Sequence, residues 1–95
     1  MRAYEVLFII RPDLEEEAIA AVVDKFTTLI NNNGGEVTNV NKWGKRRLAY
    51  EVEGFREGYY TLINFTGEPA TAQELERVLR ITDETMKYLI TRKDA

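Results

Sequence analysis

The hydrophobic residues of this chain recur at two different spacings, and the change of spacing divides the chain into six elements. Alternation of apolar and polar residues is typical of a half-buried strand, and it predicts strands over residues 2–11, 36–52, 59–66 and 85–92. Apolar residues three and four positions apart are typical of an amphipathic helix, and they predict helices over residues 13–30 and 71–80. The chain is therefore expected to follow the order βαββαβ.

Both predicted helices carry start signals. Asp13 with Glu16, and Thr71 with Glu74, have the spacing of a capping box, in which a short polar side chain and a carboxylate satisfy free backbone N–H groups. Gly34 suits the left-handed conformation that often ends a helix. We therefore expect the first helix to begin at Asp13 and to end before Gly34.

The second predicted strand is long and is interrupted near Trp43-Gly44. Glycine inside a strand often marks a β-bulge or a bend, so we expect an irregularity there. Residues 53–58 are expected to form the turn into the third strand, and residues 67–69 (Gly-Glu-Pro) to end that strand.

This order of elements predicts an α+β, ferredoxin-like βαββαβ domain spanning residues 1–95, with a four-stranded antiparallel sheet and two helices on one face. The strands over 36–52 and 85–92 are expected at the two edges of the sheet. The other face stays open and is less polar than a solvated face. The apolar residues expected on it are Leu7, Ile9, Tyr60, Leu62 and Leu89. Such a patch is typical of a surface that binds a protein partner or a second copy of the chain.

Composition excludes most catalytic and metal chemistry. The 95 residues contain no Cys and no His, which removes disulfides, thiolate or imidazole metal sites, and nucleophiles activated by a His base. No cofactor and no metal are expected. Glu15, Glu16 and Glu17 are interpreted as a solvated first helical turn.

No apolar run approaches the roughly 20 residues of a membrane span. Residues 1–5 do not resemble a signal peptide, so we expect a cytosolic protein.

Charge is unevenly distributed along the chain. The net charge is −3, yet four of the six residues from 42 to 47 are basic, whereas residues 13–30 hold five acids and one base. A basic strand in an acidic domain indicates an anionic partner, most commonly nucleic acid. Lysines and arginines also protect a sheet edge from pairing with another strand, and the two interpretations are compatible.

Two other functional motifs match poorly. The segment around Tyr59 and Tyr60 is only faintly similar to an RNA-recognition motif, because Thr61 and Asn64 stand where stacking aromatic residues belong. Acylphosphatases share the βαββαβ order and bind phosphate in a glycine-bearing loop. Here residues 11–14 (Arg-Pro-Asp-Leu) contain no glycine, and Asp13 would compete with bound phosphate.

Nearly the whole chain resembles the bacterial ribosomal small-subunit protein S-six family. The most specific element is Gly-Lys-Arg-Arg-Leu-Ala-Tyr at residues 44–50. Other matching segments are residues 2–5 (Arg-Ala-Tyr-Glu), 11–13 (Arg-Pro-Asp), 58–60 (Gly-Tyr-Tyr) with Asn64, and 79–83 (Leu-Arg-Ile-Thr-Asp). Glu51 departs from the family pattern, which usually has proline there.

The resemblance implies a ferredoxin-like fold, no catalysis, and a structural role in the small ribosomal subunit. It implies binding to the central domain of the small-subunit ribosomal RNA as a heterodimer with ribosomal protein S-eighteen. The residues expected to contact RNA are Arg2, Lys42, Lys45, Arg46, Arg47, Lys87, Arg92 and Lys93. Those expected to contact the protein partner are Trp43, Arg46, Arg47, Leu48, Tyr50 and Tyr60.

Two alternative functions remain at this point. One is a self-associating regulatory domain that uses its open sheet face for dimerisation or for a small ligand. The other is an acylphosphatase-like enzyme.

Overall fold

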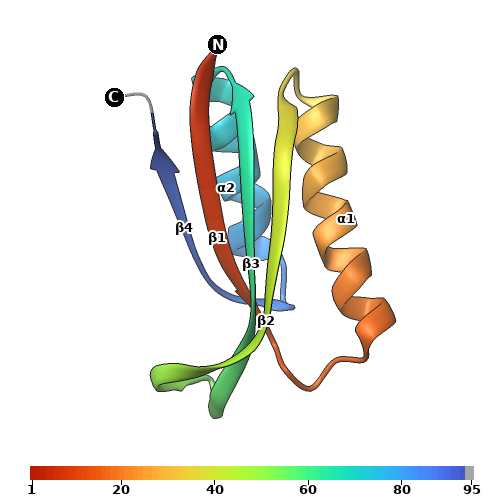
Figure 1. The fold of residues 1–95 in the computed structure, drawn as a ribbon, viewed down its shortest axis with the longest axis vertical. Coiled ribbons are helices and arrows are strands. Elements are labelled where there is room, and N and C mark those ends of the chain that lie inside the picture. The colour runs from red at the N-terminus through yellow and green to blue at the C-terminus, as the bar shows by residue number, and fades with distance from the viewer. Residues whose placement is uncertain (94–95) are drawn as a thin grey trace.

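The computed structural model describes residues 1–93 and contains the six expected elements in the expected order (Figure 1). They are β1 (Arg2–Ile10), α1 (Glu16–Asn32), β2 (Glu36–Val52), β3 (Phe55–Gly67), α2 (Pro69–Ile81) and β4 (Thr85–Arg92). The strands form one sheet in the order β2-β3-β1-β4, and every neighbouring pair is antiparallel. This arrangement confirms the predicted ferredoxin-like class, with β2 and β4 at the edges.

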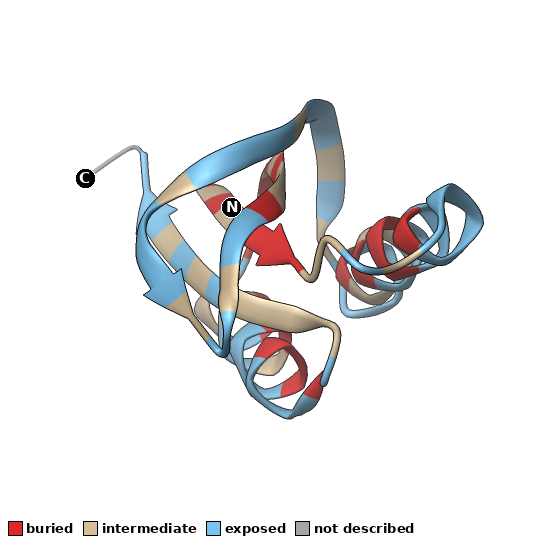
Figure 2. Cartoon of the chain, turned by 90° about the horizontal axis from the view of Figure 1, so that it is seen from below, coloured by how far each residue is buried: buried red, intermediate tan, exposed pale blue. Residues whose placement is uncertain are grey.

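The core lies between the two helices and one face of the sheet. Alternate residues of β1, among them Val6 and Phe8, are fully buried there and pack with α1 and α2. Phe8 meets Phe26 of α1 edge to face, with ring centroids 5.1 Å apart. Figure 2 shows the buried positions of both helices on the sides that face the sheet. In the described part of the chain, neither helix is long and apolar enough to cross a membrane.

Neither predicted capping box forms. The helix α1 begins at Glu16 rather than Asp13, with Glu15 at its N-cap and no side-chain cap bond. Asp13 instead accepts a hydrogen bond from the Arg11 guanidinium at 3.0 Å. The nearby cation holds this carboxylate outside the helix, so the prediction of the box was wrong.

The helix α2 begins earlier than predicted, at Pro69. Proline is well suited to the first helical position, because its ring fixes φ at a helical value and it lacks an N–H that would stay unpaired there. Thr71 therefore lies inside the first turn. Its hydroxyl donates to the backbone carbonyl of Asn33 at 2.7 Å, and Glu74 pairs with Arg77.

The predicted helix end is confirmed, whereas the predicted hairpin turn was too long. Gly34 follows α1 with a φ of +80°, the left-handed conformation expected of a helix end. The turn between β2 and β3 contains only Glu53 and Gly54, with φ values of 51° and 83°. Two consecutive positive φ values suit a tight hairpin turn, so β3 begins at Phe55.

The register of β2 with β3 shifts at three places, of which the one between Val37 and Asn39 lies near the start of the strand. The other two lie farther along. The predicted irregularity is present, because the register with β3 shifts between Lys42 and Gly44, and Gly44 has a φ of +88°. The last shift was not predicted. Arg47 pairs with Glu57 and Val52 with Phe55, so residues 48–51 (Leu-Ala-Tyr-Glu) oppose Arg56 alone. We refer to residues 48–51 as the flap.

Candidate nucleic-acid and protein interface

The single tryptophan lies in an aromatic and cationic cluster on the open face of the sheet. Trp43 stacks on Tyr60 of β3, with ring centroids 6.0 Å apart and an interplanar angle of 7°. The Arg46 guanidinium carbon lies 5.1 Å from the centroid of the Trp43 ring. Trp43 remains 36% exposed. An accessible aromatic ring held by a second ring and a cation is a chemically suitable anchor for a macromolecular partner.

The flap crosses from the β2–β3 hairpin toward β4. In Figure 1 the far end of this hairpin turns away from the rest of the sheet, toward the side on which β4 lies. Leu48 approaches Gly58, while the Lys87 ammonium group of β4 donates a hydrogen bond to the Tyr50 hydroxyl. A hollow of about 110 Å³ lies under the flap. Two of the predicted partner contacts, Leu48 and Tyr50, are thus placed beside β4.

The apolar open face has a second hollow beside the flap. The register places Leu7 of β1 opposite both Leu62 of β3 and Leu89 of β4. A hollow of about 200 Å³ is lined by Leu7, Ile9, Lys87, Tyr88 and Leu89. Leu89 is 62% exposed. The predicted contacts omitted Leu7, Ile9 and Leu89, although alternation had placed all three on this face.

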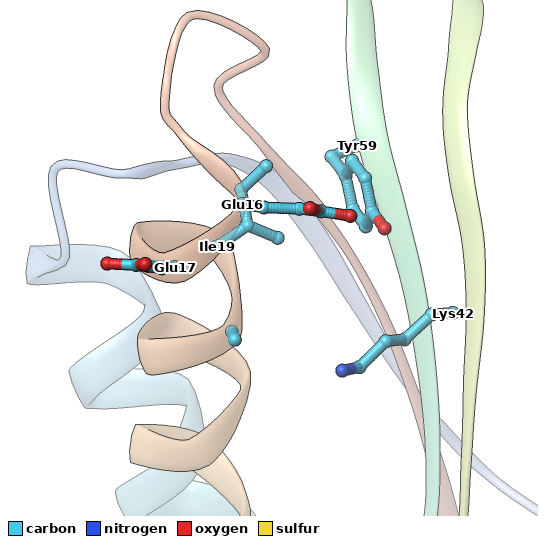
Figure 3. A pocket seen from close by; sticks show the side chains of 6 residues that line it. Glu16, Glu17, Ile19, Lys42 and Tyr59 are labelled. Atoms are coloured by element: carbon cyan, nitrogen blue, oxygen red, sulfur yellow. The ribbon is translucent and has the colours of Figure 1, made fainter.

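The structure divides the basic cluster of residues 42–47 between the two faces of the sheet. Arg46 lies beside Trp43, but Lys42 pairs with Thr61, which is fully buried on the helix side. Figure 3 shows the Lys42 side chain pointing into a hollow of about 360 Å³ between the sheet and α1, where Glu16 and Tyr59 also point. Acidic side chains there oppose phosphate binding by Lys42.

Lys45 and Arg47 also lie away from the tryptophan cluster. Lys45 pairs with Tyr59, whose side chain packs against the core, and Arg47 pairs with Glu57. Opposed residues of an antiparallel pair share a face, so both basic residues lie on the helix side of β2. They lie beyond the Lys42 position, toward the hairpin turn.

A separate basic group lies at the opposite end of the sheet. Arg2 pairs with Gly67 and Arg92 pairs with Tyr4, so both lie where β1 begins and β4 ends. The backbone N–H of Lys93 donates to Ala3, and its ammonium group lies 3.8 Å from a Glu5 carboxylate oxygen. Figure 1 shows the start of β1 and the end of β4 toward the top and the hairpin turn at the bottom. Arg2, Arg92 and Lys93 therefore lie at the same end of the sheet, far from Arg46, with Arg2 and Arg92 on the helix side and Lys93 beside Glu5 on the open face.

The loop after β1 is not a phosphate-binding loop. The Arg11 guanidinium is paired with Asp13, and its carbon lies 5.5 Å from the Phe55 ring centroid. Asn64, which an acylphosphatase-like site would also require, pairs with Glu5 on the open face. Within residues 1–93, no group of three acidic side chains is arranged to hold a metal ion. Thus Arg11 and Asn64 do not form a common site.

Comparison with known proteins identifies one family over nearly the full chain. The family model described as "Ribosomal protein S6" matches residues 3–92. The small ribosomal subunit protein bS6 of Moorella thermoacetica is 65% identical over 92 residues, which cover 97% of this chain and 94% of that protein. The protein of the same name from Desulfitobacterium hafniense is 56% identical over 94 residues, with 99% of each chain covered. The crystal structure of 30S ribosomal protein S6 from Thermotoga maritima superposes with a TM-score of 0.93 and 35% identity, covering 97% of this chain and 87% of that one.

Proposed function

The chain belongs to the ribosomal protein S6 family, and from that premise we propose that it binds the central domain of small-subunit ribosomal RNA as a heterodimer with ribosomal protein S-eighteen. Family membership makes it a non-enzymatic protein of the small ribosomal subunit, located on the cytoplasmic ribosome. The acylphosphatase alternative is therefore wrong. The proposal concerns the two partners and the surfaces that bind them.

The observation that carries the proposal is the exposed Trp43–Tyr60 stack with Arg46 beside it. Trp, Tyr and Arg are the residue types that most often dominate protein interfaces. The stack continues into the apolar side chains of the open face, of which Leu89 is the most exposed. We assign this face, including Leu48 and Tyr50 of the flap, to the protein partner S-eighteen.

The basic residues away from the Trp43–Tyr60 stack are assigned to RNA phosphates. The strand-end group of Arg2, Arg92 and Lys93 supplies one contact area. Lys45 and Arg47, on the helix side of β2, supply a second. Lys42 is the least suitable of the predicted contacts, because it shares a hollow with Glu16 and Glu17. With few cations and a net charge of −3, this chain alone is expected to bind RNA weakly.

The proposal is tested by measuring binding to a central-domain RNA fragment over a salt series. The samples are this protein, S-eighteen, and the two mixed. We expect tight binding only from the pair, and the logarithm of its association constant should fall linearly with the logarithm of salt concentration. In the triple variant Arg2→Gln, Arg92→Gln, Lys93→Gln, the slope should decrease by about 0.9 for each lost phosphate contact.

The matched control removes two exposed arginines of α2, Arg77→Gln and Arg80→Gln, and should leave the slope unchanged. An unchanged slope in the triple variant would contradict the assignment of the strand-end group. If no mixture binds RNA and the protein dimerises by itself, the self-associating alternative replaces the proposal.

A further inference from the structure

We infer that Lys87 is a positioning residue of the proposed protein interface, and that it fastens the flap to β4 through the Tyr50 hydroxyl without contacting RNA phosphate. The inference rests on the proposed function, because it concerns how that interface is shaped. It changes the role that the sequence suggested for Lys87, which was a direct phosphate contact.

The flap depends on side-chain contacts for its position. Four residues of β2, 48–51, oppose one residue of β3, Arg56, between the pairs Arg47–Glu57 and Val52–Phe55. A bulge interrupts the ladder of backbone hydrogen bonds that normally fixes a strand. What holds the flap over the sheet is therefore its contacts with the residues beneath it.

Besides the ion pair of Glu51 with Arg56, at 3.9 Å, the flap makes an apolar contact and a polar contact. Leu48 approaches Gly58, lines the same hollow as Ile9, and supplies an apolar contact. The hydrogen bond from Lys87 to Tyr50 connects the flap to β4, an element 37 residues away in sequence. The hollow of about 110 Å³ under the flap indicates that apolar packing there is incomplete. The Lys87 contact therefore adds a polar link between the Tyr50 end of the flap and β4.

The geometry leaves the Tyr50 ring available to a partner. The Lys87 ammonium group lies 4.4 Å from the ring centroid and bonds to the hydroxyl, while Tyr50 as a whole is 62% exposed. Lys87 also lines both hollows of the open face, the face assigned to the protein partner. Holding a tyrosine in place before binding reduces the conformational entropy that association must remove.

The test is a double-mutant cycle. Lys87→Met keeps the length of the side chain but removes the charge, and Tyr50→Phe keeps the ring but removes the hydroxyl. Association with S-eighteen is measured by calorimetry without RNA. Each single variant should weaken association by about fivefold, the order expected from one net hydrogen bond. The double variant should be no weaker than either single variant, because both remove the same bond. Lys87→Arg, which retains a donor, should restore the affinity.

Two further measurements separate positioning from direct contact. In the pair, Lys87→Met should leave the salt slope of RNA binding unchanged, whereas the matched control Lys93→Met should lower it by about 0.9. In the free protein, amide hydrogen exchange of residues 49–51 should accelerate in Lys87→Met and in Tyr50→Phe, with the amides of α1 unchanged. This exchange measurement requires neither partner.

Several results would overturn the inference. A lower salt slope in Lys87→Met, with no effect of Tyr50→Phe, would make Lys87 a phosphate contact. Additive losses in the double variant would mean that Lys87 and Tyr50 act separately. Faster exchange with unchanged affinity would remove the flap from the interface. If the unaltered protein fails to bind S-eighteen, the proposed function fails, and hydrogen exchange alone then shows whether Lys87 holds the flap.

Discussion

At the scale of single residues, two buried threonines differ in how their hydroxyls are satisfied. Thr71 is 2% exposed and donates to the Asn33 carbonyl. Thr61 is 0% exposed, and within residues 1–93 its hydroxyl has no hydrogen-bond partner. A buried polar group without a partner costs about 1–3 kcal/mol, whereas a satisfied one stabilises the fold. Replacing each hydroxyl by a methyl group should therefore have opposite effects on stability.

Thr61→Val should raise the free energy of unfolding by about 1 kcal/mol, and Thr71→Val should lower it by a similar amount. Chemical denaturation, followed by the fluorescence of the single tryptophan, measures both. The two variants serve as controls for each other, because each exchanges a buried hydroxyl for a methyl group. A loss of stability in Thr61→Val would mean that its hydroxyl is satisfied in solution.

Gly58 is required by the close approach of Ile9 and Met86, at a place that Leu48 of the flap also contacts. A Cβ at this position would lie 2.2 Å from Cγ2 of Ile9 and 2.9 Å from Cε of Met86. Neighbouring side chains would have to move. Gly58→Ala should therefore destabilise the protein by about 1–3 kcal/mol, the usual cost of overpacking.

The matched control is Gly54→Ala in the hairpin turn, where a Cβ meets nothing within 4 Å but φ is +83°. Only backbone strain of about 1–2 kcal/mol is expected there. Thermal unfolding compares the two variants. Faster hydrogen exchange in residues 48–51 is expected for Gly58→Ala alone. Equal exchange in both variants would contradict a specific role of Gly58 under the flap.

At the scale of elements, α2 carries an ion pair with a measurable electrostatic effect. The Arg77 guanidinium donates two hydrogen bonds to Glu74, at 2.8 and 2.7 Å. This hydrogen bonding, with the attraction of the charges, holds the pKa of Glu74 below its ordinary value of 4.5. A carboxyl whose pKa is lowered by folding stabilises the folded state above its unfolded pKa. That contribution is lost as the pH falls through the folded pKa.

Carboxyl chemical shifts measured by NMR over a pH series should show Glu74 titrating with a pKa below 4.5. Arg77→Leu should return this pKa toward its ordinary value, because the hydrogen-bond donor is removed. The matched control is Arg80→Leu, which removes the neighbouring ion pair of α2 and should leave the titration of Glu74 unchanged. An unaltered Glu74 titration in Arg77→Leu would show that the ion pair does not persist in solution.

At the scale of the whole molecule, acidic and basic residues are distributed unevenly. Acidic residues are concentrated on and just before α1, and basic residues lie in two other areas. Residues 13–30 hold five acids and one base, and their field repels a polyanion that approaches α1 itself. Under the proposed function, this acidic helix directs RNA toward the basic areas rather than binding it. Long-range repulsion of this kind is screened by salt.

The variant Glu17→Gln, Asp24→Asn should therefore strengthen RNA binding by the pair by about twofold at low salt. The gain should disappear at high salt. Binding rates and equilibrium constants across a salt series measure the effect, and Thr28→Gln on the same helix is the neutral control. Weaker binding in the double variant would mean that α1 contacts RNA or the partner directly.

Local patterns in the sequence were enough to predict the element order, the fold class and the open apolar face. The reason is that each strand or helix needs apolar residues on the side that it buries. This need produces the alternation and the helical spacing that can be read along the chain. The bulge at Gly44 was predictable for a similar reason, since a glycine inside a strand often lies at a bulge or a bend. The motif at residues 44–50 was specific enough to indicate the family.

Only the tertiary structure decided the helix starts, the flap and the roles of individual cations. Thr71 was expected to cap α2, but its hydroxyl instead donates a hydrogen bond to the backbone carbonyl of Asn33, which is 38 residues away in sequence. The flap exists because β2 and β3 pair with unequal lengths, which neither strand reveals by itself. Lys42 faces the acidic α1, whereas Lys87 bonds to Tyr50. The residues next to a lysine or arginine in the sequence do not show which groups it will contact. Its function depends on partners that only folding brings within a few ångströms of it.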